Sequence, residues 1–112
     1  MLSFLRKLIA SFGRRIAKGR GLHVLAFVED VPAEVQRRTV YVIGEDGHVW
    51  SAAMECPCGC GETIQLSMVQ KSRPHWEFMR HWDDTVSLTP SVWRQVGCRS
   101  HFWLKKGNVH WC

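Results

Sequence analysis

Four of the five cysteines in this chain of 112 residues lie in two short patches whose spacing suits metal binding. Residues Cys56–Cys60 carry the sequence CPCGC, and residues Cys98–His101 carry CRSH. Thiolates and an imidazole on two turns are the ligands that Zn²⁺ favours in a tetrahedral site. The two patches therefore predict one zinc site that joins distant parts of the chain.

Five side chains compete for the four places around such an ion. They are Cys56, Cys58, Cys60, Cys98 and His101. Three thiolates with His101 are the arrangement that we expect, because the spacing of Cys98 and His101 lets both reach one ion from a single turn. The spacing within the first patch leaves open which of its three thiols is spare.

The same residues permit either a structural or a catalytic metal. A catalytic zinc keeps one position open for water, which a nearby carboxylate deprotonates. Glu62 follows the first patch and is the candidate base, with Glu55 in reserve, while Ser100 is the candidate for holding an oxyanion. Several thiolates, however, neutralise the ion and weaken it as a Lewis acid, which favours a purely structural site. Residue chemistry leaves both readings open.

Apolar residues at helical spacing, with basic residues between them, open the chain and predict an amphipathic helix over residues 2–18. The helix is expected to end near Gly19 and Gly21. Its apolar face has three conceivable destinations: the body of the protein, a partner protein, or an anionic membrane surface. We therefore divide the chain into a basic helical arm, residues 1–20, and a single zinc-binding β domain, residues 21–112.

From residue 22 onward, the pattern changes to that of short strands. A hairpin is predicted over residues 39–54 with Asp46-Gly47 as its turn, and a second over residues 102–111. Thr89 or Ser91 reads as the cap of a short helix over residues 92–96. The predicted fold is mainly β (α+β): a small antiparallel sheet stapled by one zinc site, with the N-terminal amphipathic helix.

The charge is distributed unevenly. Residues 1–20 contain six Lys or Arg and no acid, whereas the remaining chain has nine basic residues against ten acidic ones. The body is therefore not expected to bind nucleic acid. Clustered thiols without a secretory signal point to the reducing cytoplasm.

Several elements together resemble a small bacterial family long catalogued as a domain of unknown function. They are the motif CPCGCGE at residues 56–62, TPS at residues 89–91, GCRSHFW at residues 97–103 and GNVHW at residues 107–111. Some members are encoded beside bacterial ubiquitin-like conjugation genes, where a peptidase that trims or removes the ubiquitin-like protein has been proposed. The resemblance implies a zinc-dependent peptidase acting in that pathway, with a ubiquitin-like protein as its partner. The alternative is a non-enzymatic, zinc-stapled interaction module.

Overall fold

A computed structural model describes residues 2–112 as eight strands and one helix; Met1, the first residue of the predicted arm, lies outside this range. The elements are α1 (Leu2–Gly19), β1 (Val24–Val28), β2 (Thr39–Glu45), β3 (His48–Glu55), β4 (Thr63–Ser67), β5 (Glu77–Arg80), β6 (Val86–Trp93), β7 (His101–Lys105) and β8 (Asn108–Trp111). The mainly β fold with an N-terminal helix is confirmed. Both predicted hairpins are present, as β2–β3 and β7–β8.

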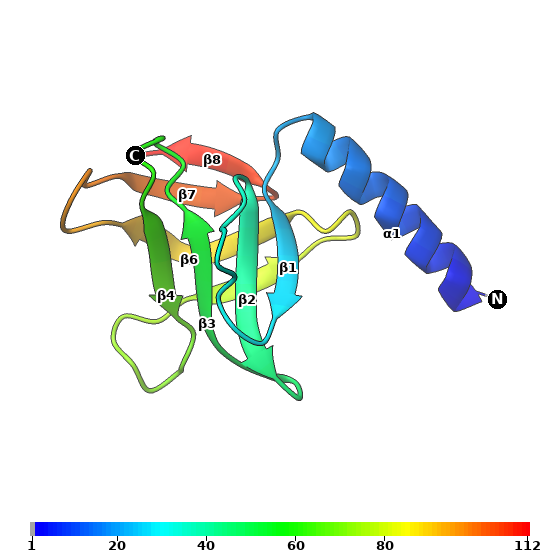
Figure 1. Cartoon of the computed structure of the whole chain (residues 1–112), viewed down its shortest axis with the longest axis horizontal. Coiled ribbons are helices and arrows are strands. Elements are labelled where there is room, and N and C mark those ends of the chain that lie inside the picture. Colours follow the sequence, from blue (N-terminus) through cyan, green and yellow to red (C-terminus); the bar gives the residue numbers. More distant parts are fainter. Residues whose placement is uncertain (1) are drawn as a thin grey trace.

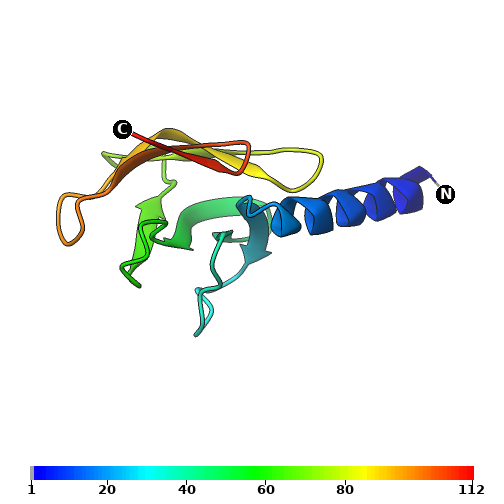
Figure 2. The same cartoon turned by 90° about the horizontal axis from the view of Figure 1, so that it is seen from above.

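The strands form two sheets of four rather than one. The first sheet has the order β1-β2-β3-β4, and the second has the order β5-β6-β7-β8. Figure 2 shows the two sheets stacked face to face, with α1 extending from one side. All the pairs are antiparallel except β1–β2, which is parallel because residues 29–38 return the chain to the starting end of β1.

One apolar core fills the space between the sheets. Its buried members alternate along the strands of both sheets, as half-buried strands require. They are Leu25, Val40, Val42, Ala52, Met54, Cys56, Ile64, Leu66, Val86, Leu88, Val92, Phe102 and Leu104. Cys56 is thus both a core residue and the first residue of the predicted metal patch.

The short helix expected over residues 92–96 is wrong. Strand β6 continues through this region to Trp93, with an irregularity in its pairing to β7 between Leu88 and Val92. Tertiary packing overrides the local capping signal, because Val92 is needed in the core and an extended chain places it there. Ser91 is therefore a strand residue rather than a helix cap.

Candidate active site and thiol cluster

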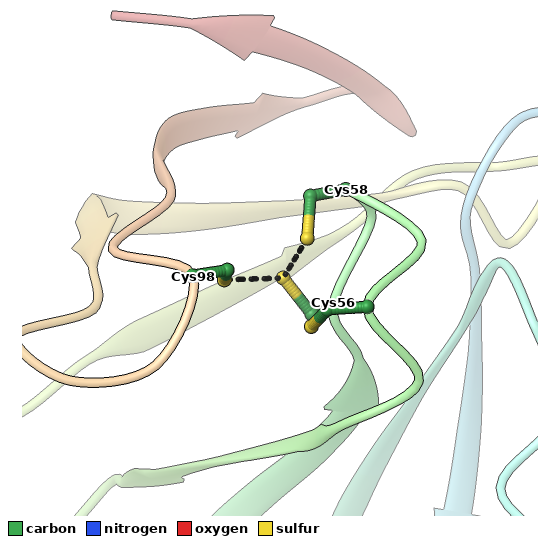
Figure 3. Close-up of side chains that lie close together, drawn as sticks. Cys56, Cys58 and Cys98 are labelled. Atoms are coloured by element: carbon green, nitrogen blue, oxygen red, sulfur yellow. Dashed lines mark hydrogen bonds between the residues drawn. The ribbon is translucent and has the colours of Figure 1, made fainter.

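Four thiols meet where the β3–β4 turn approaches the loop that precedes β7. The sulfur atoms of Cys56, Cys58, Cys60 and Cys98 all lie within 4.8 Å of one another. The Sγ of Cys56 is 3.3 Å from that of Cys58 and 3.6 Å from that of Cys98. Figure 3 shows Cys56 and Cys58 on one turn facing Cys98 on the other segment. The four residues can hold a metal ion between the two sheets.

The backbone of the first turn explains how three thiols within five residues converge. Gly59 and Gly61 have φ angles of 89° and 83°, in the left-handed region that glycine adopts without strain. The amide of Cys56 donates a hydrogen bond to the carbonyl of Glu62 at 2.9 Å and closes the turn. The predicted tight turn is therefore present, and all three of its thiols reach the cluster.

His101, one of the five predicted ligands, is not a member of this cluster. Strand β7 begins at His101, and Phe102 beside it is fully buried, so the imidazole lies on the opposite, outer face of its sheet. There its Nε2 lies 3.0 Å from the Oγ of Ser91. Cys60 supplies the fourth clustered group in its place, and no thiol of the first patch is spare.

Ser100 and Glu62, the two predicted catalytic residues, both lie beside the thiols. The Oγ of Ser100 is 3.1 Å from the Sγ of Cys98. The carboxylate of Glu62 forms an ion pair with Arg94, and this guanidinium also donates to the Sγ of Cys98 at 3.2 Å. Arg94 therefore links the carboxylate to the cluster and occupies one of its oxygens.

The surroundings shift the pKa values of two clustered thiols in opposite directions. Burial raises the pKa of Cys56 to about 11, because the core disfavours its thiolate. Hydrogen bonds from the side chain and backbone of Ser100 lower the pKa of Cys98 to about 6. Cys98 therefore favours its thiolate without help from a metal, whereas Cys56 does not.

Ser91 and His101 form a second constellation on the outer face of the β5–β8 sheet. Trp93 pairs with His101 across β6 and β7, and the two rings stack with centroids 4.9 Å apart and planes 11° apart. The indole of Trp76 donates to the carbonyl of Ser91 at 3.2 Å. Tryptophans thus contact both the backbone of Ser91 and the imidazole of His101. Among the described residues, no carboxylate hydrogen-bonds to His101.

Sequence patterns alone do not indicate this pair, because Ser91 reads as a helix cap and His101 as a metal ligand. The signal that joins them is strand pairing. When residues 86–93 and 101–105 are read as neighbouring strands, Trp93 pairs with His101. Ser91, two residues before Trp93, then lies near His101. That reading was hidden by the Thr-Pro-Ser sequence, which is typical of helix starts.

A second serine–histidine contact occurs on the same sheet, between the Oγ of Ser87 and the Nε2 of His81 at 2.8 Å. The Ser87 hydroxyl also accepts the backbone amide of Lys106 at 2.9 Å and so secures the β7–β8 turn. These two contacts account for Ser87 as a structural residue. Ser87 therefore provides a matched comparison for Ser91.

The fold and site define a small two-sheet β domain that carries a cysteine cluster and a separate serine–histidine pair. The chain belongs to the BubE family, described as a bacterial ubiquitination-like system serine protease, whose family model matches residues 27–112. The recognised resemblance to a domain of bacterial ubiquitin-like operons is thereby confirmed. Comparisons with curated proteins and with solved structures give no significant match.

Proposed function

We propose that this protein is a serine peptidase of a bacterial ubiquitin-like pathway, with Ser91 as its nucleophile and His101 as its general base. The observation that carries the proposal is the 3.0 Å distance between the Ser91 hydroxyl and the His101 Nε2, in a chain whose family is described as a serine protease. A hydroxyl is a weak nucleophile until a base within hydrogen-bond reach takes its proton. Here the base is already at that distance.

In the proposed reaction, the Ser91 oxygen attacks the carbonyl carbon of the scissile bond while His101 Nε2 accepts the hydroxyl proton. The tetrahedral intermediate collapses as His101 passes that proton to the leaving amine, which leaves an acyl-enzyme on Ser91. Water then repeats the sequence: His101 takes its proton, the oxygen attacks the ester, and Ser91 regains its proton. The pair acts as a dyad.

Trp93 and Trp76 support this chemistry by fixing the geometry of the pair. Stacking on Trp93 holds the plane of the imidazole, so that Nε2 stays directed at Ser91. The hydrogen bond from Trp76 restrains the backbone of Ser91. Positioning of this kind matters because small displacements of a nucleophile or base cost large factors in rate. We assign both tryptophans positioning roles.

An extended peptide has a suitable path to the pair. Strand β4 is an edge strand of its sheet, and an open cavity of about 220 Å³ lies between it and residues 92–96. Ile64, Trp76 and Trp93 contribute to its lining. Extended peptides add to exposed sheet edges and place alternate side chains in such hollows. The C-terminal tail of a ubiquitin-like protein is the partner that we propose for it.

The thiol cluster is proposed to hold a structural Zn²⁺. The ligand set fits, because sulfurs bound tetrahedrally at zinc–sulfur distances lie about 3.8 Å apart, close to the 3.3 Å and 3.6 Å found here. Four thiolates fill the coordination sphere and leave no place for a catalytic water. The bound ion would stabilise the loop between β6 and β7, from which His101 emerges. Its reduced thiols fit a reducing compartment, which we take to be the cytoplasm.

A zinc-dependent reaction with Glu62 as base and Ser100 at the oxyanion is the competing proposal. It fits the site less well for two reasons: the cluster has four thiols rather than three ligands, and Glu62 is paired with Arg94. The non-enzymatic interaction module is the other alternative. It shares the structural metal with our proposal but assigns no reaction to Ser91.

The decisive experiment combines a substrate with a covalent probe. The purified protein is incubated with a ubiquitin-like protein of the same operon carrying a C-terminal extension, and separately with a fluorophosphonate that labels activated serines. We expect cleavage at the extension and probe attachment at Ser91, located by peptide mass spectrometry. Label on Ser100 would assign the nucleophile to Ser100 instead of Ser91. Cleavage that occurs without label and depends on Glu62 would favour the zinc reaction. The absence of both cleavage and label would favour the interaction module.

A further inference from the structure

The apolar stripe of helix α1 has no partner among the described residues. Six large apolar side chains along it are 48–66% exposed: Phe4, Leu5, Leu8, Ile9, Phe12 and Ile16. In Figure 1, the helix projects away from the β sheets over most of its length. A continuous exposed stripe of this kind usually marks a surface that another body covers.

The helix contacts the body through a different face, which fixes the outward direction of the stripe. Gly13 and Ala17 are buried, and a Cβ on Gly13 would approach the Trp82 ring to 2.6 Å. Arg14 donates to the carbonyl of Leu25 and forms an ion pair with Asp84 at 3.2 Å. The helix therefore packs on the body through small residues, and its large apolar face does not take the first of the three predicted destinations, the body of the protein.

The charges of the arm indicate what covers the stripe. Residues 1–20 carry six basic side chains and no acid. At 3.6 residues per turn, Arg6 and Lys18 fall on opposite flanks of the stripe and Arg15 at its edge. Cations flanking an apolar stripe are typical of helices that lie in the plane of an anionic bilayer, with the apolar side chains below the headgroups.

A second copy of the chain fits this surface poorly. Pairing two such helices through their stripes would bring together Arg6, Arg15 and Lys18 of both copies without an acid from either arm, and like charges held close repel. No helix among the described residues is long and apolar enough to span a membrane. The arm lies outside residues 27–112, which the family model matches.

We propose that α1 docks this protein on an anionic lipid surface, with the stripe of residues 4–16 inserted at the headgroup boundary and the basic residues against lipid phosphates. This docking is independent of the reaction at Ser91. It would hold the β domain at the membrane through the contact of Gly13, Arg14 and Ala17 with the body.

Vesicle flotation of the full chain tests the proposal. The vesicles contain phosphatidylcholine alone or phosphatidylcholine with phosphatidylglycerol, and the variant is L8D/F12D. A charge-matched control is V69D/M79D, which adds the same two acids at exposed apolar positions of the β domain. Circular dichroism and metal content report that all three proteins are folded.

The wild type and the control should float with the anionic vesicles, and added salt should weaken their binding. The partition coefficient of L8D/F12D should be lower by about a hundredfold, because two apolar side chains no longer insert. Equal flotation of all three proteins would overturn the proposal, and so would binding to neither vesicle. A concentration-dependent dimer in sedimentation velocity that L8D/F12D abolishes would instead assign the stripe to a second copy.

Discussion

The thiol cluster and the Ser91–His101 pair share the short stretch of chain from Cys98 to His101, yet they are built in different ways. The cluster gathers four sulfurs from two turns, where local backbone conformation brings them together. The pair joins two neighbouring strands on the outer face of one sheet, where strand register brings it together. One constellation gathers thiols from turns of both sheets, while the other places a half-buried hydroxyl and imidazole on the outer face of one sheet.

The two sites are connected through the loop that precedes β7. Cys98 belongs to the cluster and His101, three residues later, belongs to the pair. Ser100 between them contacts the Sγ of Cys98. A metal held by the cluster would therefore restrain the start of β7 without entering the reaction. The comparison shows that a cysteine cluster which dominates the sequence pattern can have a supporting role, by restraining the segment that carries a neighbouring site.

The sharpest way to break this comparison is to remove the proposed nucleophile. Ser91→Ala should lower kcat/KM for the ubiquitin-like precursor by about a thousandfold or more, because the variant lacks the hydroxyl that forms the acyl-enzyme in the proposed reaction. Metal content and the thermal unfolding midpoint should stay at the wild-type values. Steady-state kinetics and elemental analysis measure both.

Ser87→Ala is the control for that experiment, since Ser87 also contacts a histidine on the same sheet. It should keep nearly all of the activity. If Ser91→Ala remained fully active, the dyad would be refuted; if Ser100→Ala were inactive instead, the chemistry would move to the cluster.

The next largest effect is expected from Cys56→Ser, which removes one sulfur of the thiol cluster. Cys56 is only 2% exposed and belongs to both the core and the cluster. Its loss should release the metal and lower the free energy of unfolding by at least about 3 kcal/mol, since metal binding and folding are coupled. Metal content and urea denaturation measure these changes.

Cys112→Ser serves as its control, because Cys112 is an exposed cysteine outside the cluster. That variant should keep its metal and its stability. Should Cys56→Ser retain the wild-type metal content, the four-thiol site would be wrong.

A smaller effect should follow from Trp93→Leu, which removes the ring stacked on His101. Because such contacts contribute about 0.5–1.5 kcal/mol, we expect kcat to fall by roughly threefold to tenfold. Trp93 is 60% exposed, so stability should change little. A fall in kcat at constant stability would identify positioning, and a shifted pH profile would show that the ring acts through His101.

Trp50→Leu, on the other sheet, provides the comparison for a partly exposed tryptophan far from the pair in sequence. Its kcat should match the wild type. Equal losses in the two variants would mean that Trp93 contributes only general stability.

Local patterns predicted much of this fold. Asp46 and Gly47 have φ angles of 50° and 81°, as the turn of the predicted β2–β3 hairpin requires. The helix over residues 2–18 follows equally from short-range spacing, and the convergence of the two cysteine patches follows from the ligand chemistry that they share. The split into two sheets does not, because it depends on which strands share an edge.

The pair depends on the same long-range information. Ser91 and His101 become neighbours only when β6 continues past Pro90. The strand continues there because Val92 is buried in the core. Residue types at 98 and 101 matched a common metal spacing, so His101 was assigned to the nearer constellation. Spacing along the chain can bring two side chains to one turn, but it does not say on which face of a strand the second one lies.

The smallest expected effect belongs to Glu62→Gln, and it separates the two readings of the cluster most directly. If Glu62 only pairs with Arg94, the variant should lose at most about 1 kcal/mol of stability, as exposed ion pairs do, and kcat/KM should stay near the wild-type value. If Glu62 were the base of a metal-bound water, kcat/KM would fall by about 10²–10⁴-fold. Because glutamine keeps the shape and can still accept a hydrogen bond from Arg94, a large loss of activity with intact metal and stability would leave only the catalytic explanation.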